Sequence, residues 1–178
     1  MRTWTQDGYL RAARFAAQAH GAQTLPRTEL PYLLHVTSVA MEVMAAFRAE
    51  PDQDQELAMQ CALLHDVVED TPVTLDEVRT AFGPAVAAGV SALSKDPALA
   101  KDQQLQDSLQ RILQQPHEVW MVKLADRITN LQPPPAHWTR EKIARYREEA
   151  KLIHDSLGAA SRALSMRIQE KIESYPVA

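Results

Sequence analysis

The chain has 178 residues, of which 46% are hydrophobic, and a formal net charge of −4 at pH 7. A chain of this length is expected to form one domain over residues 1–178, and its interspersed acidic and basic residues argue against a binding surface for duplex nucleic acid. It has one cysteine, no apolar stretch long enough to cross a membrane and no signal segment, so we expect a cytoplasmic protein without disulfides.

The composition favours helices along the whole chain. Only five residues are glycine, whereas the helix-favouring residues alanine, leucine, glutamine, glutamate and arginine are abundant. We therefore predict an all-α fold, a bundle of about seven to nine helices around one hydrophobic core.

The first two predicted helices each carry a histidine beside an apolar face. The first helix ends at Gly21, and His20 closes its apolar face, where a lone histidine is typical of a structural residue. A loop over residues 21–30 leads to the second helix, which Pro31 begins. His35 borders the apolar stripe of that helix. The members of the stripe are Val36, Val39, Ala40, Val43 and Phe47.

The third predicted helix ends in a cluster of ionisable residues. Its apolar stripe consists of Leu57, Cys61, Leu64 and Val68, the spacing of one buried helix face. Residues four apart share a helix face, so an uninterrupted helix would stack Glu69 over His65 and Asp70 over Asp66. Carboxylates are rarely buried unless they are paired or bind a cation, and a metal ion would satisfy this cluster.

The second half of the chain continues the helical pattern. A capping box at residues 74–77 begins a short helix, and a loop over residues 94–97 contains Lys95. After a glutamine-rich surface helix, an apolar helix over residues 119–131 contains Asp126 and Asn130, four apart on one polar line. Three prolines end that helix, and two amphipathic helices follow.

Four of these side chains adjoin apolar stripes on three separate helices: His35, His65, Asp66 and Asp126. Two imidazole nitrogens and two carboxylates could together hold a divalent ion of Mn, Fe, Co or Zn and leave coordination positions free for water and substrate. The alternative is that these side chains satisfy one another inside the core. The residues alone leave both interpretations open, because one sequence does not show which helices meet.

Three segments resemble the signatures of the HD-type hydrolase domain of RelA/SpoT proteins. They are Pro31-Tyr32-Leu33-Leu34-His35, residues 62–71 with the sequence ALLHDVVEDT, and residues 122–131 with the sequence VKLADRITNL. In length the chain is most similar to the small stand-alone alarmone hydrolases of that family. The resemblance implies the HD-domain helical bundle and hydrolysis of the 3′-pyrophosphate of ppGpp or pppGpp to GDP or GTP and pyrophosphate.

The resemblance also implies a role for individual residues. His35, His65, Asp66 and Asp126 would hold a Mn²⁺ ion, or another divalent transition metal. Glu69 and Asp70 would orient or deprotonate the attacking water. Four further residues would contact the guanosine nucleotide substrate, with Asn130 near the ribose. The other three are Lys95, Arg27 and Tyr146.

Other functions remain open at this point. The same metal and water could hydrolyse another nucleotide, for example at the 2′-phosphate of NADPH. A nucleotide-binding regulator without catalysis is a second alternative, although it would have no need for the carboxylates Glu69 and Asp70. A helical scaffold is the third. The sequence does not indicate the oligomeric state.

Overall fold

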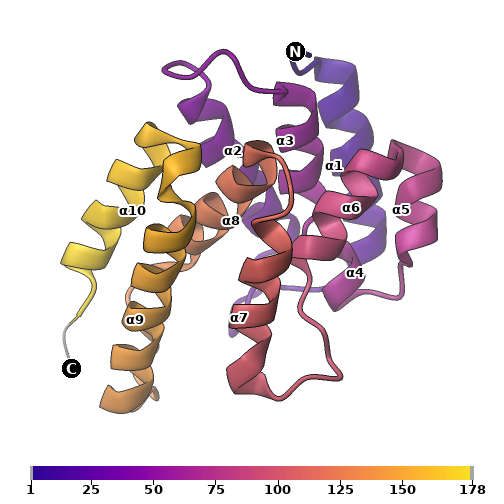
Figure 1. Ribbon diagram of the computed structural model, residues 1–178. Coiled ribbons are helices and arrows are strands. Elements are labelled where there is room, and N and C mark those ends of the chain that lie inside the picture. Colours follow the sequence, from indigo (N-terminus) through magenta and orange to yellow (C-terminus); the bar gives the residue numbers. More distant parts are fainter. Residues whose placement is uncertain (1, 177–178) are drawn as a thin grey trace.

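A computed structural model describes residues 2–176, and these residues form an all-α bundle (Figure 1). The fold class predicted from the sequence is therefore confirmed. The elements are α1 (Gln6–His20), α2 (Leu33–Ala46), α3 (Gln55–Leu64), α4 (Val67–Asp70), α5 (Leu75–Phe82), α6 (Pro84–Leu93), α7 (Lys101–Ile112), α8 (His117–Asn130), α9 (Arg140–Leu157), the 3-10 turn η1 (Gly158–Ala160) and α10 (Arg162–Ser174). Among the described residues, every helix is too short or too polar to span a bilayer.

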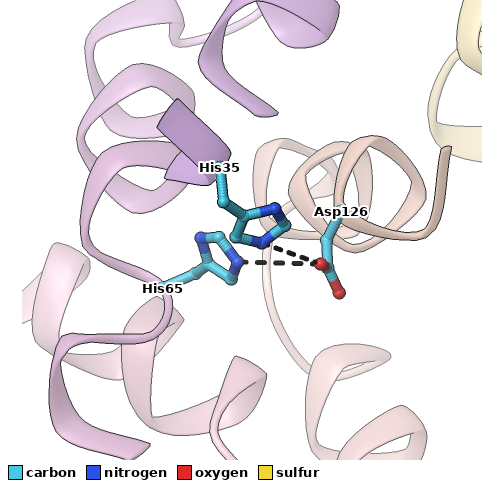
Figure 2. Close-up of side chains that lie close together, drawn as sticks. All are labelled: His35, His65 and Asp126. Carbon is cyan, nitrogen blue, oxygen red and sulfur yellow. Dashed lines mark ion pairs between the residues drawn. The ribbon is translucent and has the colours of Figure 1, made fainter. Parts of the chain in front are cut away.

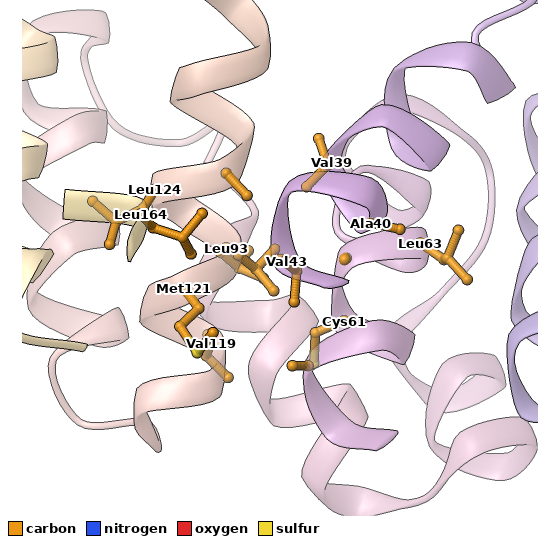
Figure 3. Close-up of a cluster of buried hydrophobic side chains, with 14 of the residues drawn as sticks. Val39, Ala40, Val43, Cys61, Leu63, Leu93, Val119, Met121, Leu124 and Leu164 are labelled. Carbon is orange, nitrogen blue, oxygen red and sulfur yellow. The ribbon is translucent and has the colours of Figure 1, made fainter. Parts of the chain in front are cut away.

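Helices α2, α3 and α8 pack against one another at the centre of the bundle. Helix α1 packs on α3, while α9 and α10 lie side by side and cover α8 (Figure 1). The central faces carry small and branched residues, including the fully buried Val39 and Val43 of α2 and Leu124 of α8 (Figure 3). Helix α3 is buried along nearly its whole length, because it has neighbours on several sides. Its C-terminal end therefore carries His65 into the interior, with Asp66 beside it, whereas Asp70 stays exposed.

The second helix begins later than the sequence predicts. Pro31 lies outside α2 and forms an isolated antiparallel bridge with Thr24. The amide of Tyr32 donates a 2.9 Å hydrogen bond to the carbonyl of Gln23, so this bridge replaces the expected first helical turn. The loop over residues 21–30 is thereby folded back onto the start of α2, where His35 lies.

The predicted continuation of the third helix through Val68 is wrong. Helix α3 ends at Leu64, and the separate single turn α4 starts at Val67. His65 and Asp66 occupy the break between them, with Asp66 at φ −100° and ψ −5°. The amide of Asp70 still donates a 2.9 Å hydrogen bond to the carbonyl of Asp66, so these two residues remain one helical turn apart although the longer helix is interrupted.

Candidate metal centre

Three ligand-type side chains from three helices meet in the centre of the bundle. His35 lies in the first turn of α2, His65 at the C-terminal end of α3 and Asp126 in α8, and each is less than 10% exposed. Nε2 of His35 is 3.4 Å and Nε2 of His65 is 3.8 Å from Oδ1 of Asp126 (Figure 2). These three atoms all lie within 4.8 Å of one another, a spacing compatible with one shared metal ion.

Asp66 lies beside the same two imidazoles. Its Oδ2 atom is 3.1 Å from Nε2 of His65 and 3.5 Å from Nε2 of His35. The hydroxyl of Tyr32 donates a 2.6 Å hydrogen bond to the same oxygen. The structure therefore brings together all four residues that the sequence singled out as metal ligands, and it adds Tyr32, which sequence reasoning missed. The one local indication of Tyr32 in the sequence was its position three residues before His35, which puts both side chains near the same helix face.

The chemistry of this cluster fits a transition-metal ion. Nδ1 of His65 lies 2.9 Å from the backbone carbonyl of Ala62, whereas Nε2 is buried and makes no hydrogen bond within residues 2–176. With its proton on Nδ1, the ring presents the Nε2 lone pair to the cluster, which is the usual arrangement of a metal-ligating histidine. Two imidazole nitrogens with two carboxylates suit Mn, Fe, Co or Zn.

The carboxylates of the cluster keep their negative charge despite their burial. Burial alone would raise the pKa of Asp126, but Nζ of Lys123 at 3.1 Å and the two imidazoles hold it well below its usual range. The pKa of Asp66 is likewise lowered when the imidazoles of His65 and His35 are protonated, because their charge then outweighs the effect of burial. Burial and the charge of Asp66 together raise the pKa of Tyr32 far above its ordinary value, so its hydroxyl remains a donor.

The profile of the HD-domain family matches residues 12–163 of the chain. The chain belongs to the HD-domain family.

Within this family the HD domain is similar to proteins called MESH1. It is 34% identical over 163 residues to the human guanosine-3′,5′-bis(diphosphate) 3′-pyrophosphohydrolase MESH1, covering 87% of each chain. The Drosophila melanogaster protein of the same name is 29% identical over 96% of each chain. A solved structure described as a metazoan orthologue of SpoT that hydrolyses ppGpp superposes with a TM-score of 0.81 at 27% identity, over 99% of each chain. The HD domain is thus MESH1-like, as its resemblance to RelA/SpoT hydrolase domains predicted.

The side chains of Glu69 and Lys95 are in direct contact. Nζ of Lys95 lies 2.6 Å from Oε1 of Glu69, and the backbone amide of Lys95 donates a 2.8 Å hydrogen bond to Oε2. This pair joins α4 to the loop after α6. Asp70, at the end of α4, is reachable from solvent, while partial burial and the charge of Asp66 raise its pKa. Asp70 therefore lies close enough to the cluster for the charge of Asp66 to act on it, while Glu69 faces Lys95.

A cleft of about 710 Å³ opens beside the cluster. It is bordered by the loop before α2, the C-terminal end of α8 and two aromatic side chains of the α9 region, Trp138 and Tyr146. His35 and Asn130 reach its wall. The amide of Asn130 also donates a 2.6 Å hydrogen bond to Oδ1 of Asp126, so the cleft and the cluster share a wall.

Arg127 holds the aromatic side of the cleft in place. Its guanidinium lies 4.2 Å from the centroid of the Tyr146 ring and forms a 3.5 Å ion pair with Glu149. Burial raises the pKa of Tyr146 to about 12. Arg27 is exposed, with a left-handed φ of 63°, and is not among the described residues that line the cleft. The structure thus brings Asn130 and Tyr146 together at the cleft and leaves Arg27 on the neighbouring loop.

Proposed function

We propose that this protein hydrolyses the 3′-pyrophosphate of ppGpp or pppGpp, giving pyrophosphate and GDP or GTP. The observation that carries the proposal is the buried cluster of His35, His65 and Asp126, open on one side to a cleft large enough for a nucleotide. Similarity to the MESH1 proteins supports the same reaction.

We propose that His35, His65, Asp66 and Asp126 hold a Mn²⁺ ion. Bound there, a divalent cation supplies Lewis acidity and lowers the pKa of water, so that a nucleophile is available near neutral pH. Asn130 and Lys123 hydrogen-bond the Asp126 carboxylate and keep it oriented. The donor set itself does not distinguish manganese from iron, cobalt or zinc. We choose manganese because of the similarity to RelA/SpoT domains.

The carboxylates of α4 supply the proton chemistry. The water oxygen forms a bond to the phosphorus attached to the 3′ oxygen of the ribose, and the bond between that phosphorus and the 3′ oxygen breaks. Asp70 accepts the proton that the water loses, for which its raised pKa is suited. Glu69 orients the same water, and the 3′ oxygen leaves as the hydroxyl of GDP or GTP with a proton taken from solvent.

The remaining contacts position the nucleotide. In this proposal the ammonium of Lys95, which is paired with Glu69, exchanges that carboxylate for a substrate phosphate. Trp138 and Tyr146 offer aromatic faces for the guanine base, and Asn130 offers a polar group at the ribose. We assign to Arg27 a contact with the outer edge of the nucleotide, because its loop forms the rim of the cleft.

The test is an end-product assay with ppGpp and Mn²⁺, in which anion-exchange chromatography separates GDP and a coupled assay measures pyrophosphate. The expected result is equal amounts of GDP and pyrophosphate, with turnover lost in the presence of a chelator. His65→Asn should abolish turnover, while the matched variant His117→Asn, on the surface of α8, should keep it. Release of inorganic phosphate from NADPH, with ppGpp left intact, would instead identify a phosphohydrolase of another nucleotide. Binding of ppGpp without turnover would identify a regulator.

A further inference from the structure

Tyr32 makes a short contact with the metal cluster from a helix that also carries one of the proposed ligands. It lies at the N-terminal end of α2, three residues before His35, and its hydroxyl donates to Oδ2 of Asp66 at 2.6 Å. This separation is typical of a hydroxyl bound to an ionised carboxylate, which is among the stronger hydrogen bonds in proteins. The two residues are 34 positions apart, so the bond ties the start of α2 to the break between α3 and α4.

The ring of Tyr32 packs against two imidazoles. Its centroid is 4.6 Å from the ring of His20 and 5.4 Å from the ring of His35. Its backbone amide donates to the carbonyl of Gln23 at 2.9 Å, which anchors the residue to the preceding loop. These contacts determine where the hydroxyl points, and they give the buried His20 a role in the support of the cluster.

Asp66 depends on such support more than Asp126 does. Asp126 lies inside α8 and has hydrogen-bond partners one turn away on the same helix, Lys123 and Asn130. Asp66 lies in the break between two helices, and Tyr32 is its one side-chain hydrogen-bond partner within residues 2–176 apart from the imidazoles. Without that partner, rotation of the side chain could carry Oδ2 away from His35 and His65.

We propose that Tyr32 is a positioning residue, whose hydroxyl holds Oδ2 of Asp66 toward the two imidazoles so that all four ligands can coordinate one divalent cation. This inference rests on the metal site of the proposed function, and it concerns affinity for the cation in advance of any chemistry. Loss of a group that orients a metal ligand typically costs roughly 10–100-fold in metal affinity. We expect a loss of that size for Tyr32→Phe, which keeps the ring and removes only the hydroxyl.

The experiment is a double-mutant cycle on Mn²⁺ affinity, measured on the purified full-length protein by the electron paramagnetic resonance signal of free Mn²⁺. The four proteins are the wild type, Tyr32→Phe, Asp66→Asn and the double variant. The matched control is Tyr9→Phe, a half-buried tyrosine of α1 whose hydroxyl makes no hydrogen bond in the described part of the chain. Thermal unfolding without metal checks that each variant is folded.

If the hydroxyl acts through Asp66, Tyr32→Phe weakens Mn²⁺ binding about 10–100-fold in the wild type and less than about threefold in the Asp66→Asn background. Tyr9→Phe leaves the affinity unchanged. An affinity of Tyr32→Phe within twofold of the wild type, or an equal loss in both backgrounds, would overturn the inference. Phenylalanine is close in shape to tyrosine; if Tyr32→Phe nevertheless failed to fold, His20→Asn would serve as the second variant, with a smaller loss of Mn²⁺ affinity expected and an unchanged affinity counting against the inference.

The readout separates this inference from the proposed function. If the protein binds Mn²⁺ and Tyr32→Phe weakens that binding, but ppGpp stays intact, Tyr32 is retained as a positioning residue and the hydrolase is refuted. If the protein hydrolyses ppGpp but Tyr32→Phe leaves its Mn²⁺ affinity unchanged, the hydrolase is supported and the role of Tyr32 is refuted.

Discussion

Replacement of Lys123 by methionine tests the electrostatics of the cluster. Lys123 is 8% exposed, and its ammonium lies 3.1 Å from Oδ2 of Asp126 on the same face of α8. Methionine keeps most of the apolar stem and removes the charge. The variant therefore leaves Asp126 buried with one fewer positive neighbour, while His35, His65 and Asn130 remain in contact with it.

The expected cost follows from the geometry. At 3.1 Å, and with an effective dielectric constant of about 20, two unit charges attract by about 5 kcal/mol. Removing one partner of a buried pair typically costs about 3–5 kcal/mol, and the remaining contacts of Asp126 favour the lower end. For a chain of this size, about 3 kcal/mol lowers the unfolding temperature by roughly 6–12 °C.

The assay is thermal unfolding followed by circular dichroism, with and without saturating Mn²⁺. In metal-free buffer, Lys123→Met should unfold well below the wild type. With Mn²⁺ the gap should narrow, because Asn130 still orients the Asp126 carboxylate while the loss of a positive charge beside it strengthens cation binding. Tighter binding then stabilises the folded state further.

Lys101→Met is the matched control, since Lys101 is exposed at the start of α7 and forms no ion pair in the part of the chain that the structure describes. Its free energy of unfolding should change by less than about 0.5 kcal/mol. A loss below about 1 kcal/mol for Lys123→Met without metal, or a gap that widens when Mn²⁺ is added, would refute this account of Asp126.

Three further variants test other parts of the molecule. Asp70→Asn should lower kcat for ppGpp by about 10²–10⁴-fold with Mn²⁺ affinity unchanged, and full activity would remove Asp70 from the mechanism. Lys95→Met should raise KM for ppGpp roughly tenfold, whereas an unchanged KM in steady-state kinetics would exclude a phosphate contact. Gly89→Ala should destabilise the protein by about 1–3 kcal/mol in urea unfolding, because the new Cβ would lie 2.7 Å from Sγ of Cys61, and Cys61→Ala should relieve part of that loss. A stability gain from Gly89→Ala alone would show that helix propensity outweighs the overlap.

The similarity to MESH1 proteins and the cluster geometry support each other from independent directions. Identities near 30% show membership of the family, and the meeting of His35, His65 and Asp126 shows that this chain forms the cluster itself. The Lys95–Glu69 pair adds a feature that neither motif spacing nor identity describes.

Much of the fold could be predicted from the sequence, because helices depend on interactions within four residues. Apolar spacing located the core faces of α3, α8 and α9, and the capping box at Thr74 and Glu77 is present. The same local rules put the candidate ligands beside buried faces. They could not detect the break after Leu64, because the helical pattern of apolar residues continues through Val68 while tertiary packing turns the chain.

By itself, the sequence determined the helical class, the core faces and the residue types available for a cation, since these follow from periodicity and side-chain chemistry. Only the tertiary structure decided which of those residues share one point in space. The contacts of Tyr32 with Asp66 and of Lys95 with Glu69 join positions 34 and 26 apart, and they depend on how α2, α4 and the loop after α6 are placed against one another. Such placement is a property of packing among many side chains, and no local spacing encodes it.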